Sequence, residues 1–262
     1  AENPGGQQYA AAIARVIAGN LTGTGLLREV PAAAHVGRIT GFDAPIQFAD
    51  WRAVNARALI TGAVRVDGRR ITVKFRLFDV LTGQQMGEGL QLDGQTDQWR
   101  RMAHRVSDQV YSRLTGETGY FDSRVVFIAE TGPRERRLKQ VAIMDQDGEN
   151  VQVLTDGAAL TFAPRFSPLG DRILFTGYDS GFPRIYLMDL ATRRRQTIGD
   201  QPGTMTFAPR FSPDGGSVVY SLSVEGRTNL YLLNLASGQR WQLTNSAAID
   251  TAPSFSPDGR WI

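Results

Sequence analysis

Cysteine is absent from the 262-residue sequence, and histidine occurs only twice, as His35 and His104. The absence of cysteine excludes disulfides and thiolate metal sites, and it fits either the cytoplasm or a bacterial periplasm. Two histidines without cysteine also leave few ligands for zinc. His104 falls within a predicted helix and His35 within an alanine-rich loop, so we expect structural roles for both. The sequence therefore predicts no metal ion and no other cofactor.

The sequence also lacks long apolar runs and the motifs of common enzyme classes. It has no stretch of ~18 apolar residues, which excludes a conventional transmembrane helix. Residues 1–4 do not show the basic-then-apolar order of a signal peptide, so we expect that any export signal has been removed or lies outside this sequence. Neither Gly-x-Ser-x-Gly nor Gly-x-x-x-x-Gly-Lys occurs, and Gly23-Thr24-Gly25 lacks the third glycine of a dinucleotide-binding turn. We predict that the protein is not an enzyme.

The formal net charge is only +3, although basic side chains gather locally. The two basic clusters are Arg134, Arg136, Arg137 and Lys139, and Arg193, Arg194 and Arg195. Either cluster could contact nucleic acid or an anionic membrane surface. Both flank expected hairpins, however, where charge keeps loops and strand edges solvated. We therefore predict no nucleic-acid partner and no membrane insertion.

Residues 1–120 combine helical and strand patterns and predict an α+β domain. The expected helices cover 7–20, 49–56 and 96–114, and the expected antiparallel strands cover 58–66, 71–77 and 85–92. Apolar and polar residues alternate strictly in 71–77, which is typical of a strand with one buried face. Asp67-Gly68 suits a hairpin turn. Thr96 is a candidate N-cap for the last helix, and Gly116 can end it.

An internal repeat dominates the second half of the sequence. Phe-Ala-Pro-Arg-Phe-Ser-Pro occurs at 162–168 and again at 207–213, and Ala-Pro-Ser-Phe-Ser-Pro-Asp-Gly follows at 252–259. The period is about 45 residues, with short strands between the copies, which is typical of β-propeller blades. Ser-Pro-Asp-Gly suits a tight turn, and Leu169 replaces the aspartate in the first copy. We expect the alanine-proline pair at the crowded inner edge of each blade.

We expect the phenylalanine before each Ser-Pro to pack between neighbouring blades; these residues are Phe166, Phe211 and Phe255. Three strands precede the first copy, 162–198 and 207–244 make two full blades, and 252–262 begin another. Residues 121–262 therefore predict about two and a half to three blades. Since a propeller closes its ring to hide strand edges, we expect an incomplete all-β propeller after the α+β domain.

The repeats and the domain before them together resemble the TolB family, the periplasmic component of the Tol–Pal envelope system of Gram-negative bacteria. The resemblance lies in 208–215, 229–238 and 241–244, and in the N-terminal stretches 59–66, 73–81 and 113–116. It implies a six-bladed propeller whose mouth binds the peptidoglycan-associated lipoprotein Pal, and an N-terminal segment that binds TolA. It also implies a periplasmic location and a role in outer-membrane integrity and cell division. We expect the TolA-binding segment and first strand before Ala1, and about half of the propeller after Ile262, to be missing.

By position, the loops that lead into each repeat line the propeller mouth that meets Pal in the family. The candidate partner-binding residues are Thr161, Phe162, Arg165, Met205, Thr206, Phe207, Arg210, Asp250 and Thr251. Several of them could instead fill the propeller axis. Propeller loops are rigidly presented and often carry function.

An alternative function belongs to a different class. The repeats could be the propeller portion of a prolyl-oligopeptidase-type serine peptidase whose hydrolase domain is missing. The α+β domain ahead of the blades argues against this alternative, because such peptidases as a rule lack that unit.

Overall fold

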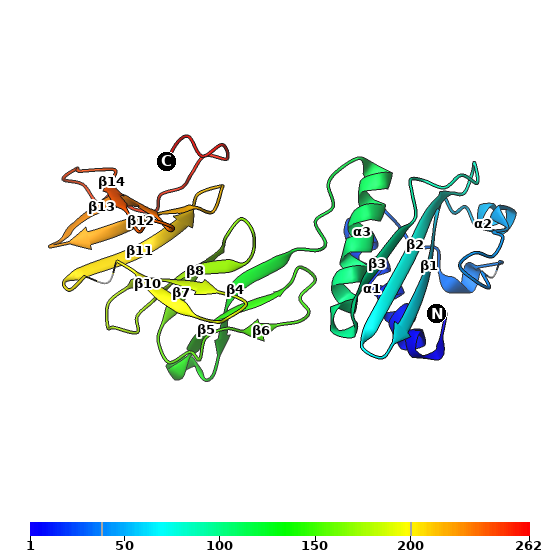
Figure 1. Cartoon of the computed structure of the whole chain (residues 1–262), viewed down its shortest axis with the longest axis horizontal. Coiled ribbons are helices and arrows are strands. Elements are labelled where there is room, and N and C mark those ends of the chain that lie inside the picture. Colours follow the sequence, from blue (N-terminus) through cyan, green and yellow to red (C-terminus); the bar gives the residue numbers. More distant parts are fainter. Residues whose placement is uncertain (38, 200) are drawn as a thin grey trace. The chain divides into compact units, whose positions relative to one another are not determined.

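The computed structural model describes residues 1–37, 39–199 and 201–262. It divides into two compact units, Ala1–Ser123 and Arg124–Ile262 (Figure 1). The first unit combines helices with one antiparallel sheet, and the second consists of antiparallel sheets. An α+β domain followed by an incomplete propeller was the predicted fold class, and it is confirmed. The domain bounds 1–120 and 121–262 stay a prediction.

The first unit packs two long helices on one face of a three-stranded sheet in the order β1-β2-β3 (Figure 1). Its helices are α1 (Gln7–Gly23), α2 (Phe48–Ala53) and α3 (Trp99–Thr115), with short 3-10 turns at Pro4–Gly6, Ala32–Ala34 and Thr96–Gln98. Its strands are β1 (Ala58–Asp67), β2 (Arg70–Asp79) and β3 (Leu90–Gln95). The alternation seen in 71–77 places Ile71, Val73, Phe75 and Leu77 in the core beneath α1 and α3. Each such burial contributes about 1.5–3 kcal/mol.

Two expected boundaries in this unit were wrong. The strand predicted at 85–92 begins only at Leu90, and Gln85 makes a single bridge to Phe78. Gly87 lies between them with φ 72°, a left-handed conformation that does not continue a regular strand. Thr96 is not the N-cap of the last helix, because it opens a 3-10 turn that Gln95 caps, and α3 begins at Trp99. The predicted end of α3 at Gly116 is confirmed by its left-handed φ of 79°.

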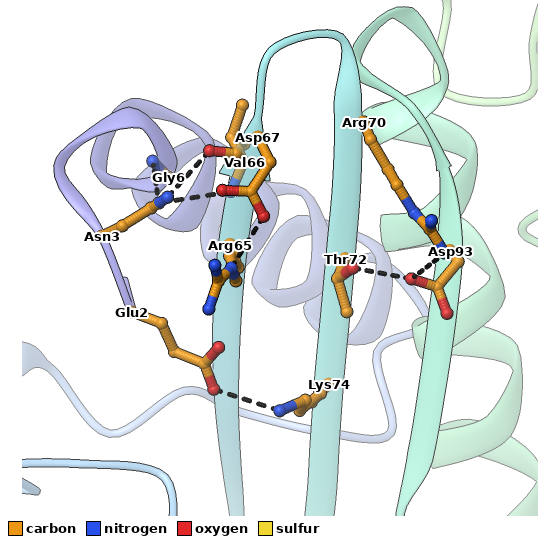
Figure 2. Close-up of polar contacts among 10 residues, drawn as sticks. All are labelled: Glu2, Asn3, Gly6, Arg65, Val66, Asp67, Arg70, Thr72, Lys74 and Asp93. Atoms are coloured by element: carbon orange, nitrogen blue, oxygen red, sulfur yellow. Dashed lines mark hydrogen bonds and ion pairs between the residues drawn. The ribbon is translucent and has the colours of Figure 1, made fainter.

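The N-terminal residues lie along the outer edge of β1 (Figure 2). The Glu2 amide donates to the Val64 carbonyl at 2.8 Å. The Asn3 side chain donates to the Val66 carbonyl at 2.8 Å and accepts from the Val66 and Gly6 amides at 3.2 and 3.0 Å. These bonds occupy backbone groups that an edge strand otherwise exposes.

Both histidines lie in structural surroundings. His104 is buried, and its Nδ1 lies 2.9 Å from the Asn20 side-chain nitrogen, which also donates to Ser107 Oγ at 2.9 Å, so the group joins α1 to α3. The His35 ring packs edge-on against Trp51, with centroids 4.9 Å apart. These contacts support the structural roles expected for the two residues.

The second unit contains three antiparallel sheets that follow the order of the sequence (Figure 1). The first comprises β4 (Arg124–Thr131), β5 (Leu138–Asp145) and β6 (Gln152–Val153), with a 3-10 turn at Arg134–Arg136. The second comprises β7 (Thr161–Phe166), β8 (Arg172–Gly177), β9 (Arg184–Asp189) and β10 (Arg195–Ile198). The third comprises β11 (Thr204–Phe211), β12 (Ser217–Val224), β13 (Arg227–Asn234) and β14 (Arg240–Gln242). Each full period of the repeat thus forms one four-stranded blade.

Residues 252–262, which were expected to begin another blade, form no strand. The segment makes only turn bonds, from the Gly259 amide to the Ser256 carbonyl and from the Ser256 amide to the Trp261 carbonyl, both at 2.9 Å. A strand needs a hydrogen-bonded neighbour, and these residues pair with no strand of the described chain.

Apolar clusters join the blades. The cluster between the first two blades contains Val141, Phe166, Ile173, Phe175, Tyr186 and Met188. The cluster between the second and third contains Leu174, Ile185, Leu187, Ile198, Phe211, Val218, Tyr220 and Leu222. Phe166 and Phe211 therefore pack between neighbouring blades, as predicted, and Phe255 is half-buried.

An arginine from one blade reaches the tight turn of the next at both junctions. Arg124 Nη2 donates to the Gly170 carbonyl at 2.6 Å, and its Cζ lies 5.4 Å from the ring centroid of Phe166. Arg172 repeats this contact one blade later, at 3.2 Å from the Gly215 carbonyl and 5.9 Å from the corresponding phenylalanine ring. The contact combines a charge-assisted hydrogen bond with a cation–π interaction.

The serine of every tight turn donates its hydroxyl to a nearby carboxylate. In the second and third copies the acceptor is the aspartate two residues later, and in the first copy, where Leu169 stands there, it is the aspartate four residues later. The pairs are Ser167–Asp171, Ser212–Asp214 and Ser256–Asp258. This hydrogen bond is the main reason that the pKa of each carboxyl lies below its ordinary value.

Replacing Arg172 with methionine keeps an unbranched stem and removes the guanidinium. We expect Arg172→Met to lower the free energy of unfolding by about 1–2 kcal/mol, because a charge-assisted bond and a cation–π contact are lost. Urea denaturation measures the change. The control is Arg227→Met, at an exposed arginine of the third blade. Equal losses in the two variants would contradict the inter-blade contact.

Acid should weaken the turns. Because folding lowers the pKa of the turn carboxyls, their stabilisation is present above the unfolded pKa of about 3.9 and is lost as the pH falls through the folded values. We expect the triple variant Asp171→Asn, Asp214→Asn and Asp258→Asn to show a shallower fall in urea midpoint between pH 5 and pH 2 (a range of about 3 units around that pKa). Glu225→Gln, at an exposed hairpin residue, should keep the full slope. If the urea midpoint of the triple variant falls with pH as steeply as that of the wild type, the turn carboxyls do not cause the acid sensitivity.

Candidate protein-binding end of the blades

One end of the blades carries a group of exposed apolar side chains. Because neighbouring strands run antiparallel, the starts of β7 and β11 lie at the same end as the loop 178–183 between β8 and β9. The exposed residues there are Leu160, Tyr178, Phe182 and Met205, and Phe182 is 59% exposed. The half-buried Phe162 ring lies 5.8 Å from the Tyr178 ring. Exposed aromatic residues and methionine are typical of protein interfaces.

A β-bulge shapes the inner strand of each complete blade. Ala163 and Ala208 have φ values of 53° and 52°, in the left-handed region that residues with a Cβ rarely occupy. The pairing register shifts at the same place in both strands, on the two residues after Phe162 and on the two after Phe207. The proline that follows each alanine has no amide hydrogen to offer the ladder. The alanine and proline together therefore lie opposite a single residue of the neighbouring strand, which defines a β-bulge.

The bulge places an aromatic residue and an arginine on one face of the strand. Phe207 pairs with Ser221 and Arg210 pairs with Val219, and those two partners share a face of β12. Without a bulge, residues three apart on a strand would lie on opposite faces. The same register brings Phe162 and Arg165 together on β7.

Two candidate residues are buried and hold the strand starts in place. Thr161 Oγ1 donates to the Lys139 carbonyl at 2.9 Å. Thr206 Oγ1 donates to the Ile198 carbonyl and accepts from the Ile185 amide, both at 3.0 Å. Any part of Thr161 and Thr206 in partner binding is therefore indirect, through the residues that they position.

The remaining candidates differ in exposure. Met205 and Arg165 are exposed, and Arg210 is half-buried. Asp250 donates its backbone amide to the Thr228 carbonyl at 3.0 Å, and its carboxylate accepts from Ser246 at 3.0 Å. Thr251 is exposed and occupies the position that phenylalanine holds in the two earlier repeats.

Sequence reasoning missed three residues of this end. Tyr178 and Phe182 are exposed in the loop 178–183, and two aromatic residues in a glycine-containing loop are a signal that could have revealed them. Arg184 is buried, and its guanidinium donates to the carbonyls of Gln201 and Thr204, which fixes the segment before β11. Nothing in its sequence surroundings distinguishes this arginine from a surface residue.

Within either compact unit taken alone, the described residues bring no three histidine or carboxylate side chains within reach of one ion. No described helix is both long enough and apolar enough to cross a membrane.

The left-handed alanine can be tested by substitution. We expect Ala208→Val to lower the free energy of unfolding by at least about 1–2 kcal/mol, because a β-branched side chain clashes at positive φ. Ala208→Gly should stay within about 1 kcal/mol of the wild type, since relief of strain offsets the freer unfolded chain. Urea denaturation compares both with Ala191→Val in an exposed turn. If Ala208→Val leaves the free energy of unfolding unchanged, position 208 is not strained by its positive φ.

Comparisons with known proteins agree with this architecture. Residues 1–86 match the TolB amino-terminal domain, and residues 111–262 match the TolB β-propeller domain. The Tol-Pal system protein TolB of Cereibacter sphaeroides is 63% identical over 252 residues, which cover 96% of this chain and 57% of that protein. The Tol-Pal system protein TolB of Ruegeria sp. is 57% identical over 205 residues, 78% of this chain and 46% of that protein.

A solved structure gives the same result. The crystal structure of TolB from Acinetobacter baumannii superposes with a TM-score of 0.77 at 28% identity, covering 95% of this chain and 61% of that one. The chain thus spans about half the length of the curated relatives it matches. Since the propeller match alone covers more than half of the chain, the protein belongs to the TolB family, whose members are components of the Tol–Pal system.

Proposed function

We propose that the protein is a non-catalytic, periplasmic binding scaffold of the Tol–Pal system, and that the described end of its blades contacts Pal. The observation that carries the proposal is the set of exposed apolar side chains on rigid strand starts and loops, together with the family membership. A rigid scaffold with variable loops binds a partner without a large ordering cost.

The arrangement of this end fits a protein partner. Phe162 and Met205 supply apolar contact area. Arg165 follows Phe162 on β7, and Arg210 follows Met205 on β11. Aromatic residues, methionine and arginine are the residue types that protein interfaces favour. The buried hydroxyls of Thr161 and Thr206 hold these strand starts against the preceding strands.

Through Pal, the protein would associate peripherally with the outer membrane and take part in its integrity and in cell division. Contact with TolA would use the N-terminal segment of the family. Membership in the Tol–Pal system is what supports both of these roles.

Titration calorimetry of the 262-residue chain against soluble Pal tests the proposal. We expect a dissociation constant of about 1 µM or tighter, equivalent to about −8 kcal/mol. The double variant Phe162→Ser and Met205→Ser should bind about tenfold more weakly or worse, because it removes apolar contact area. The matched control is Leu169→Ser, which removes an apolar side chain that is 79% exposed. Leu169 lies in the same blade as Phe162, at the opposite end.

Absence of heat at any Pal concentration would overturn the proposal for this chain. A weakening in the Leu169→Ser control equal to that of the double variant would move the contact surface to the other end of the blades.

A further inference from the structure

Two arginines occupy the same position in adjacent blades. Arg165 on β7 and Arg210 on β11 each follow the alanine-proline bulge, and β7 and β11 are in contact. Each guanidinium donates from Nη1 to the carbonyl of its own preceding proline, at 2.9 Å for Arg165 and 2.8 Å for Arg210. The two side chains are thus fixed in the same way by local backbone.

Neither arginine is paired with a carboxylate elsewhere in the described residues. Its bond to the proline carbonyl is the one hydrogen bond that each guanidinium makes within that part of the chain. Other arginines of the unit do have partners: Arg195 pairs with Asp179 at 3.2 Å, and Arg184 donates to backbone carbonyls. An arginine has five N–H donors, so most of those on Arg165 and Arg210 have no acceptor among the described groups.

The two charges also act on each other. Burial, and then the positive charge of Arg165, lower the pKa of the Arg210 guanidinium. Two like charges near one another, one of them half-buried, raise the free energy of the unbound protein. An anion placed between them would relieve this repulsion and would accept charge-assisted hydrogen bonds from both.

We propose that Arg165 and Arg210 together bind one carboxylate, supplied by an aspartate or glutamate side chain of the protein partner. The identity of the partner rests on the proposed function, but the affinity for a carboxylate does not. The forked donors of a guanidinium match the two oxygens of a carboxylate. The next repeat carries Ser254 at the equivalent position, so within the given sequence these two repeats alone carry an arginine there.

Calorimetry with Pal tests the pair in the intact chain. We expect Arg165→Gln and Arg210→Gln each to weaken Pal binding about tenfold or more, as loss of a charge-assisted bond does. The double variant should weaken it by less than the product of the single effects, because both side chains bind the same group. Arg194→Gln makes the same charge change at an exposed arginine in the turn between β9 and β10, at the opposite end of the blade, and should bind as the wild type does.

Glutarate, a free dicarboxylate, tests the site without Pal. We expect glutarate to raise the melting temperature of the wild type and of Arg194→Gln, and to leave that of the double variant unchanged. Without ligand, Arg210→Gln should unfold at the same urea concentration as the wild type or a higher one, because it removes an uncompensated charge. A merely structural arginine would instead lower that concentration.

Calorimetry with Pal and melting with glutarate distinguish failure of the proposed function from failure of the carboxylate site. Normal binding of Pal by the double variant would overturn the proposal that these arginines bind a carboxylate of the partner, and would leave the proposed function intact. If Pal does not bind the wild type but glutarate protects it through these arginines, the proposed function fails and the carboxylate site stands. Failure of both Pal and glutarate to bind would overturn both.

Discussion

Burial of each blade against its neighbour is the interaction on which the second unit depends. A four-stranded sheet has two faces, and the apolar residues of β8, β9 and β12 are buried only because they meet another blade. At about 25 cal/mol per Å² of apolar surface, these clusters supply most of the favourable free energy of the unit. The arginine contacts add a smaller term between the blades, and the serine-carboxylate hydrogen bonds stabilise the turns that Arg124 and Arg172 reach. The repeat length follows from this arrangement, since every blade must present the same two faces.

The sequence was sufficient to predict what periodicity controls. The strict alternation in β2, the stripe of apolar residues in α3 and the repeated Phe-Ser-Pro all correspond to buried faces in the structure. The pattern of apolar and polar residues does not show how one strand aligns with its neighbour. The late start of β3 at Leu90 was therefore missed. A strand also needs a neighbour, which the residues after 252 do not have in the described chain, and no property of their own sequence reveals this.

The candidate end of the blades was predictable in outline only. The repeat located β7 and β11 and therefore the residues at their starts. It could not show that Thr161 and Thr206 are buried, because a threonine in a strand is equally common on either face. Nor could it reveal the bulge, because alanine gives no sign that it will adopt a positive φ. Without the bulge, the spacing of phenylalanine and arginine suggests opposite faces, and the shared face became apparent only from the pairing in the structure.

The same bulge has a consequence for how such a protein diverges. Ala252 in the last repeat has a φ of 56°, so its backbone matches the earlier copies although Thr251 and Ser254 replace phenylalanine and arginine there. The alanine-proline pair and the Phe-Ser-Pro that follows one residue later are the same in all three copies, whereas the two positions that flank the pair differ in the last copy. Duplicated blades can therefore carry different residues at these two positions while the alanine-proline pair and the Phe-Ser-Pro stay the same. The bulge thus keeps the backbone path of a blade constant while the side chains on either side of it vary.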